Sequence, residues 1–258
     1  KKKPRTYRQR ARKDFMAITK QRKARKKNIR KALRKQLSYV KRDVRIINEL
    51  LDKTGVEFLN FNQLRTFWIV QEVYRQQQEM YDKKSHTIEN RIVSISQPHI
   101  RPIVRGKSKA STEFGAKISL SLLNGYSRVE KLSWSNFNEG VTLEEIVESY
   151  KERYGFYPEV ILADSLYRNR KNIKYCKERG IRLSGPALGR KSKEKKKEEI
   201  KALKQDAKER NAVEGKFGEA KRKYGLDRVM GKLRVTSETI IMLQFMVMNL
   251  ERKLRVLI

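Results

Sequence analysis

Hydrophobic positions recur with helical spacing in the first third of the chain. Between residues 29 and 51 the apolar side chains step by three or four, which predicts one apolar stripe on a helix of about six turns. A second stripe of this kind covers residues 61–81, after a break at Gly55 and two asparagines. We expect the two helices to pair antiparallel and to place the aromatic residues of the second one in their core.

The spacing of apolar residues changes to two after residue 91. Residues 92–95 read as a short strand, and residues 114–122 and 128–134 read as two longer strands. An Asn-Gly dipeptide at 124–125 joins the longer pair, and this dipeptide favours tight hairpins. We therefore expect an antiparallel meander in this part of the chain.

Helices and strands alternate in the following part. A capping-box pattern from Thr142 to Glu145 opens a helix. A continuous apolar run at 159–163 predicts a buried strand, and a helix at 168–179 and a strand at 181–184 come next. Alternation of this kind predicts an α/β sheet.

Three further segments complete the pattern. Residues 190–208 are almost wholly charged, so we expect a mobile linker or a solvated helix. Residues 210–226 and 237–257 both have helical spacing. The residues expected to face inward in the last helix are Ile240, Leu243, Met246, Val247, Leu250 and Leu254.

Composition narrows the class of protein. The 258 residues are 38% hydrophobic, which is enough for a core, while the net charge of +34 attracts polyanions and favours nucleic acid as the partner. The most apolar run, at 239–250, is too short to span a membrane. One cysteine and two histidines exclude a disulfide and a thiolate zinc cluster, which fits a reducing cytosol and leaves carboxylates to hold any metal.

Basic residues dominate the N-terminal helices. The first 45 residues contain 21 Lys or Arg and only two acidic residues, Asp14 and Asp43. A solvated face in a helical bundle is one interpretation, but such faces usually mix both signs, so we favour contact with phosphates. The expected organisation is a basic helical region that contacts DNA at 1–82, followed by a second domain at 83–258.

Two carboxylates and two cationic side chains form the candidate catalytic site. Asp164 follows the strand expected at 159–163, and open α/β sheets place ligands at the carboxyl ends of their strands. On a helix Arg210, Glu214 and Lys221 fall at roughly 0°, 40° and 20°, so they share one face. Such carboxylates can hold Mg²⁺, which activates water or a 3′-hydroxyl, and the cations can contact the phosphate.

Each of these features also has a purely structural interpretation. Asp164 is explained equally well as the cap of the helix that follows it. A salt-bridged helix face explains the Arg, Glu and Lys alignment about as well as a phosphate site does. Gly215 and Gly218 each cost about 1 kcal/mol in a helix relative to Ala, so we expect another group to approach that backbone closely.

Five stretches carry a family likeness: RIVSISQPHIRPIVRGK at 91–107, EFGAKIS at 113–119, YPEVILADSLYRNRKN at 157–172, CKERGIRLSGPALGR at 176–190 and RNAVEGKFGEAKRKYGL at 210–226. Together they resemble bacterial insertion-sequence transposases of the DDE class. The N-terminal KPRTYRQRARKDFMAITKQRK and the C-terminal TSETIIMLQFMVMNLERKLR are similar to the same group. The resemblance covers essentially the whole chain.

This resemblance implies an RNase H-like catalytic domain, a mixed sheet with flanking helices that holds three acidic ligands. It implies hydrolysis at transposon ends and strand transfer of the 3′-hydroxyl into target DNA, both dependent on Mg²⁺ or Mn²⁺. The implied partner is double-stranded DNA, on which the protein forms a homo-oligomer. The implied location is the nucleoid in the bacterial cytoplasm, and no membrane partner is implied. Arg105 and Lys107, in a basic loop, are expected to bind DNA phosphates beside Arg210 and Lys221.

The family's acidic residues carry over one by one. The second acid falls on Asp164 and the glutamate on Glu214. The family signature Tyr-x2-Arg-x3-Glu-x6-Lys matches Arg210, Glu214 and Lys221, but Ala207 stands at the tyrosine position. That departure puts a tyrosine role in doubt and leaves the carboxylate assignment intact.

The first acid of the triad matches no residue of this sequence. In the resembled family it lies on an early strand, before the basic helical segment with which this chain begins. We expect the chain to be N-terminally incomplete and inactive in cleavage by itself.

Two other functions stay open from the sequence. A non-catalytic DNA-binding remnant would occupy transposon ends, with a steep salt dependence and no dependence on Mg²⁺. An RNA-binding protein is disfavoured because no aromatic-rich β motif for base stacking is present.

Overall fold

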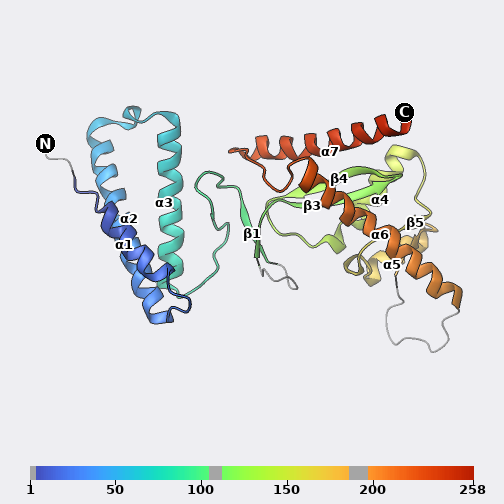
Figure 1. Cartoon of the computed structure of the whole chain (residues 1–258), viewed down its shortest axis with the longest axis horizontal. Coiled ribbons are helices and arrows are strands. Elements are labelled where there is room, and N and C mark those ends of the chain that lie inside the picture. Colours follow the sequence, from blue (N-terminus) through green and yellow to red (C-terminus); the bar gives the residue numbers. More distant parts are fainter. Residues whose placement is uncertain (1–3, 105–111, 186–196) are drawn as a thin grey trace. The chain divides into compact units, whose positions relative to one another are not determined.

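The computed structural model describes residues 4–104, 112–185 and 197–258. The chain divides into two compact units, Lys1–Pro102 and Ile103–Ile258, and Figure 1 shows the elements of both. The helices of the first 82 residues all lie in the first unit, and the second unit combines helices with short strands.

Helices make up most of the first unit: α1 (Arg8–Thr19), α2 (Lys26–Thr54) and α3 (Phe61–Asp82), with the short η1 (Val56–Phe58) before α3. The predicted antiparallel pairing of α2 and α3 is confirmed (Figure 1). Near the start of α2, Arg30 donates to the backbone carbonyl of Tyr81 near the end of α3, and its guanidinium lies 4.0 Å from the centre of the Tyr81 ring.

The core of the first unit is small. Leu37 of α2 and Phe67 and Met80 of α3 are buried. The expectation that the aromatic residues of α3 lie in the core is wrong for Phe61 and Trp68, which are 76% and 61% exposed. A pair of helices buries only one narrow side of each, and these two rings lie outside it.

Residues 92–95 form no strand, contrary to the prediction. The buried side chain of Gln76 explains the difference. It accepts a hydrogen bond from the backbone N–H of Ile92 at 2.9 Å and donates to the backbone carbonyl of Asn90 at 3.2 Å. An α3 side chain therefore satisfies backbone groups that a neighbouring strand would otherwise bond.

The second unit contains the predicted β-hairpin. Strands β3 (Lys117–Leu123) and β4 (Tyr126–Ser133) pair antiparallel, with Leu123 opposite Tyr126. Both residues of the Asn-Gly turn have positive φ, 51° and 81°, as a type I′ turn requires. The wider meander is not formed among the described strands. Strand β1 (Arg101–Val104) pairs with β2 (Thr112–Gly115) in a sheet separate from the hairpin, and Gly115, with φ of 145°, lies between β2 and β3.

The alternating part of the second unit is built from short elements: η2 (Glu139–Val141), α4 (Leu143–Tyr154), β5 (Val160–Ile161), η3 (Ser165–Tyr167), α5 (Arg170–Glu178) and β6 (Arg182–Leu183). Strands β5 and β6 pair in parallel, so their carboxyl ends point the same way. The described strands form three separate two-stranded sheets. Helices with short strands are consistent with the expected α/β class.

The core beside β5 and β6 comes from α4, α5 and the residue before β6. Its buried members are Leu143, Val147, Tyr175, Cys176 and Ile181. The strand predicted at 159–163 is shorter and less buried than expected, since β5 has two residues and the side chain of Val160 is 39% exposed.

Helix α6 (Lys197–Lys223) includes part of the charged segment predicted at 190–208. Residues 197–208 are helical rather than a mobile linker, and residues 190–196 lie outside the described part of the chain. The side chain of Asp206 accepts hydrogen bonds from Arg182 in β6 and from Ser184 directly after it. These bonds attach the helix to the strand in this segment.

Helix α7 (Arg234–Leu257) packs with the opposite side from the one predicted. It lies along the β3–β4 hairpin (Figure 1), where the Asn249 amide bonds both the N–H and the carbonyl of Ser127. These bonds turn the side with Ile241, Phe245 and Met248 inward. Of the six residues expected to face inward, all are exposed except Ile240, which is half-buried.

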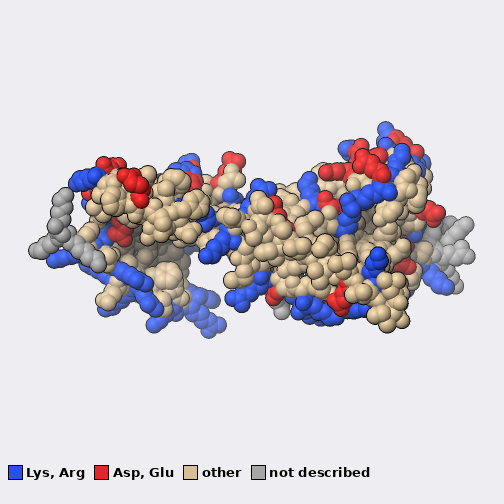
Figure 2. Space-filling model, turned by 90° about the horizontal axis from the view of Figure 1, so that it is seen from above, with Lys and Arg blue, Asp and Glu red and all other residues tan. Residues whose placement is uncertain are grey.

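Charge is distributed over both units. Figure 2 shows Lys and Arg side chains on the visible faces, with Asp and Glu interspersed among them. Among the described residues, no helix is long and apolar enough to cross a membrane.

Candidate functional site

Asp164 lies three residues beyond β5 and caps η3. Its Oδ1 accepts hydrogen bonds from the backbone N–H of Ser165 at 2.6 Å and from the Ser165 hydroxyl at 3.3 Å. The capping interpretation of Asp164 is therefore confirmed. The side chain is nevertheless 60% exposed, and within the described structure its Oδ2 accepts no hydrogen bond. One oxygen serves the fold, while the other has no described hydrogen-bond partner.

The buried amide of Asn172 fixes the segment that follows Asp164. The Asn172 side chain donates to the backbone carbonyls of Tyr167 and Gly140, both at 2.7 Å. At Gly140 a Cβ would lie 2.4 Å from the carbonyl oxygen of Leu166, so only glycine permits this close approach of η2 and η3. The η3 backbone directly after Asp164 is therefore held in place from two directions, by Asn172 and by the contact with Gly140.

Helix α6 is attached to the carboxyl end of β6 by Asp206. The buried Asp206 carboxylate accepts two hydrogen bonds from the Arg182 guanidinium, at 2.7 and 3.0 Å, and one from the Ser184 hydroxyl at 2.6 Å. The bonds from Arg182, and then that from Ser184, lower the pKa of Asp206 against the opposing effect of burial. This junction holds the helix where the parallel strands end.

One turn further along α6, Arg210 reaches Asp164. Its Nη1 lies 3.6 Å from Oδ1 of Asp164, with both side chains partly exposed. An exposed ion pair of this kind contributes little stability. Its importance is positional, because it brings the strand-end carboxylate next to the helix that carries Glu214.

Glu214 and Lys221 are exposed on α6. Glu214 follows Arg210 by one turn, about 6 Å further along the helix axis. Arg210 pairs with Asp164 and not with Glu214, so the salt-bridged helix face considered from the sequence is not formed. Among the described side chains, neither Glu214 nor Lys221 has a hydrogen bond or ion pair.

The close approach expected at the two glycines of α6 is absent from the described structure. A Cβ at Gly215 would meet no atom within 4 Å, and one at Gly218 would meet only the Arg222 side chain at 3.9 Å. The helix packs closely at Ala220 instead, which is fully buried. Phe217 lies beside Phe245 of α7, with ring centres 6.2 Å apart.

The remaining site predictions concern metal and phosphate ligands. Arg105 and Lys107 lie outside the described residues. The described part of the chain contains no group of three or more His, Cys, Asp or Glu side chains able to hold a metal ion. At the candidate site it supplies two carboxylates, Asp164 and Glu214.

Residues 161–251 match a family model described as a transposase DDE domain. The match covers about a third of the chain and includes Asp164, Arg210, Glu214 and Lys221. It supports transposase function, and with it DNA binding and the use of divalent metal ions. No curated protein and no solved structure matches the chain significantly.

The transposase-like region contains positioning residues that sequence reasoning missed. Asp206 lies in a run of charged residues and was not recognised as buried. Its position one turn before Arg210 places it on the same side of the helix, which could have indicated a role near the site. Asn169 and Asn172 have the spacing of a helix cap, and the structure confirms that Asn169 caps α5. Asn172 then reaches the two carbonyls beside Asp164, which no local pattern indicates.

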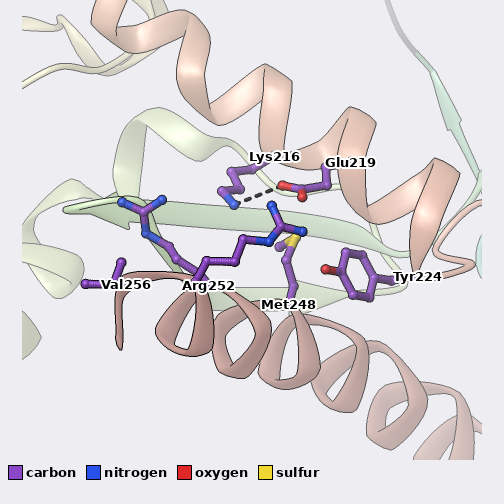
Figure 3. A pocket seen from close by; sticks show the side chains of 7 residues that line it. Lys216, Glu219, Tyr224, Met248, Arg252 and Val256 are labelled. Carbon is purple, nitrogen blue, oxygen red and sulfur yellow. Dashed lines mark hydrogen bonds and ion pairs between the residues drawn. The ribbon is translucent and has the colours of Figure 1, made fainter. Parts of the chain in front are cut away.

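A separate groove of about 430 Å³ lies between α6 and α7 (Figure 3). Its lining residues are Lys216, Glu219, Tyr224, Met248, Arg252, Arg255 and Val256. Lys216 pairs with Glu219 at 2.9 Å, and the Tyr224 hydroxyl donates to Glu251, which raises the pKa of Tyr224 to about 12. Helical geometry puts Lys216 and Glu219 roughly opposite Glu214, so the groove is not part of the candidate site.

Proposed function

We propose that this chain is the catalytic part of a DNA transposase with an RNase H-like fold. Together with the segment that carries the first acid of the triad, it cleaves phosphodiester bonds at transposon ends and joins the released 3′-hydroxyl to target DNA; by itself the chain is inactive in cleavage. The observation that carries the proposal is the 3.6 Å contact between Asp164 and Arg210. It brings the end of β5 and the Glu214 segment of α6 together inside the region that matches the transposase family.

The two carboxylates suit a hard divalent cation, Mg²⁺ or Mn²⁺. Among the described residues, Oδ2 of the exposed Asp164 side chain accepts no hydrogen bond, and Glu214 is exposed and unpaired. Magnesium sites commonly use one or two carboxylates, with waters and substrate phosphates as the other ligands. Asp164 and Glu214 would hold the ion, together with the third acid of the family's triad. Such an ion activates water or a 3′-hydroxyl and stabilises the leaving oxygen.

Arg210 and Lys221 supply the positive charge at this site. Arg210 keeps the Asp164 side chain in place through Oδ1, and its planar guanidinium has further N–H donors for a phosphate oxygen. Lys221 offers an exposed ammonium group on the same helix. The strongly basic helices of the first unit then bind the duplex through its phosphates, with the counterion release that this implies.

The decisive experiment measures end cleavage by the full product of the reading frame that contains this chain. The substrate is a plasmid that carries the element's ends, with Mg²⁺ present. Asp164→Asn and Glu214→Gln are each expected to abolish nicking, while Glu209→Gln, an exposed neighbour on α6, is expected to keep it. Normal nicking by Glu214→Gln would show that the site is assigned wrongly.

DNA binding by the same proteins separates this proposal from binding without catalysis. In the catalytic case all three variants bind the ends as wild type does, and only nicking is lost. If the wild-type full product binds DNA with a steep salt dependence but never nicks it with Mg²⁺ or Mn²⁺, the protein is a DNA-binding remnant and not an enzyme.

A further inference from the structure

Helix α7 carries a second apolar side that the described chain leaves exposed. Its members are Ile240, Leu243, Val247, Leu250, Leu254 and Leu257, which we call the α7 seam. All except Ile240 are between 47% and 72% exposed, whereas Ile241, Phe245 and Met248 on the other side are buried. Phe245 and Val247 differ by roughly 200° around the helix, so the two apolar sides are opposite.

The seam has the spacing of a two-stranded coiled coil. Its members alternate in steps of three and four over two and a half heptads, with leucine at every seventh position, 243, 250 and 257. The alternate positions hold Ile240, Val247 and Leu254. Leucine at one core position with β-branched residues at the other favours parallel dimers, and two of the three alternate positions, Ile240 and Val247, are β-branched. This pattern fits a second copy of the same helix better than an unrelated surface.

Charge also favours a second copy over the polyanions that the rest of the chain attracts. The chain has a net charge of +34, so two copies repel each other over most of their surfaces. The positions that flank the seam, by contrast, are Gln244, Met246, Glu251 and Lys253, which carry no net charge. Two copies can therefore approach here, because the flanking positions add no net charge, and the same positions offer no net positive charge to attract DNA or an anionic membrane.

We propose that the α7 seam is a homodimer contact, in which α7 of one copy packs in parallel against α7 of a second copy around a two-fold axis. The inference does not depend on catalysis. Half-exposed side chains on one helix supply less than the roughly 800 Å² per partner of a standard interface. We therefore expect a weak dimer that forms in the micromolar range and that salt strengthens by screening the net charge.

The first test is sedimentation of the full chain, freed of nucleic acid by nuclease and high salt, over a range of concentrations. Wild type is expected to shift from monomer to dimer. Leu250→Lys is expected to weaken the dimer at least tenfold without changing the melting temperature, because Leu250 is already half exposed. Val256→Lys is the matched control, since it adds the same charge to an exposed position of α7 outside the seam and should leave dimerisation unchanged.

The second test determines the orientation of the two helices. The only native cysteine, Cys176, is 1% exposed, so Leu257→Cys adds the one accessible thiol. Parallel helices place the two introduced thiols together, and mild oxidation is expected to give a disulfide-linked dimer at micromolar concentration. Antiparallel helices place them at opposite ends of a helix about 36 Å long, where no direct link forms.

Three results would overturn the proposal. A wild-type chain that stays monomeric at hundreds of micromolar in high salt has no such contact. A dimer that Leu250→Lys leaves intact uses another surface. A melting temperature that falls sharply in Leu250→Lys, with no dimer in wild type, shows that another part of the same chain covers the seam.

Discussion

Two carboxylates on α6, two turns apart, have opposite surroundings. Asp206 is buried and accepts three hydrogen bonds from Arg182 and Ser184, while Glu214 is exposed and has no described partner. The carboxylate of Asp206 accepts hydrogen bonds from the protein and therefore fixes the helix. The carboxylate of Glu214 is exposed one turn from Arg210 and is therefore available to a ligand. The turn of α6 around Asp206 is thus a closed junction, and the Glu214 segment is an open site.

Catalysis gives the largest expected difference between the two regions. In the full reading-frame product, Glu214→Gln is expected to lower Mg²⁺-dependent nicking at least roughly 1,000-fold, or about 4 kcal/mol in the transition state. Asp206→Asn, measured where it is still folded, is expected to lower nicking much less because it only positions the helix. Gel assays of nicked plasmid give both rates, and equal losses would remove the distinction.

Stability should respond in the reverse order. Asp206→Ala removes an acceptor shared by a guanidinium and a hydroxyl, and we expect a loss of about 2 kcal/mol, a value reduced because the Arg182 side chain is half exposed. Glu214→Ala is expected to change the unfolding free energy by no more than about 0.5 kcal/mol. Urea unfolding followed by circular dichroism measures both. A destabilising Glu214→Ala would mean that its carboxylate has a structural role.

Acid should weaken the closed junction selectively. Hydrogen bonds hold the pKa of Asp206 below its ordinary value of 3.8 in the folded chain. The contribution of Asp206 to the unfolding free energy is therefore fully present above pH 3.8. It is lost as the pH falls through the lower pKa that Asp206 has in the folded chain. The stability gap between wild type and Asp206→Ala should be constant from pH 7 to about pH 5 and should shrink below pH 4. A gap that is independent of pH down to pH 2 would contradict this assignment.

The smallest effect tests how open the Glu214 segment is. Gly215 lies inside α6, and a Cβ there would meet no atom within 4 Å. Gly215→Ala is therefore expected to raise the unfolding free energy by about 1 kcal/mol through helix propensity alone. Gly140→Ala is the contrasting variant, because its Cβ would collide with the Leu166 carbonyl and should destabilise the chain. Differential scanning calorimetry measures both shifts.

Elements governed by local chemistry could be predicted from the sequence. The Asn-Gly turn and the flanking alternation specified the β3–β4 hairpin, and the apolar stripes specified the α2–α3 pair. Residues 92–95 had strand spacing, but the Gln76 side chain of the preceding helix α3 accepts the hydrogen bond of the Ile92 N–H. In α7 both sides are apolar, so periodicity alone could not decide which side the hairpin would bury.

For the candidate site, the sequence suggested residues but not their contacts. Asp164, Arg210 and Glu214 were predicted from strand-end and helix-face positions, and their roles stay a prediction. The pairing of Arg210 with Asp164 instead of Glu214 depends on where α6 lies, and Asp206 fixes that position. Asp206 stands in a charged segment whose residues are mostly expected to be exposed. The sequence therefore could not show that this one carboxylate is buried.

The two tryptophans give the molecule a built-in pair of optical probes, one in each unit. Trp68 of the first unit is 61% exposed, whereas Trp134 of the second is 7% exposed and donates its indole N–H to Glu238. Iodide should quench Trp68 emission and spare Trp134, and a duplex that covers the basic helices should protect Trp68. Fluorescence of a single unlabelled sample can therefore report on DNA contact in one unit and on unfolding in the other.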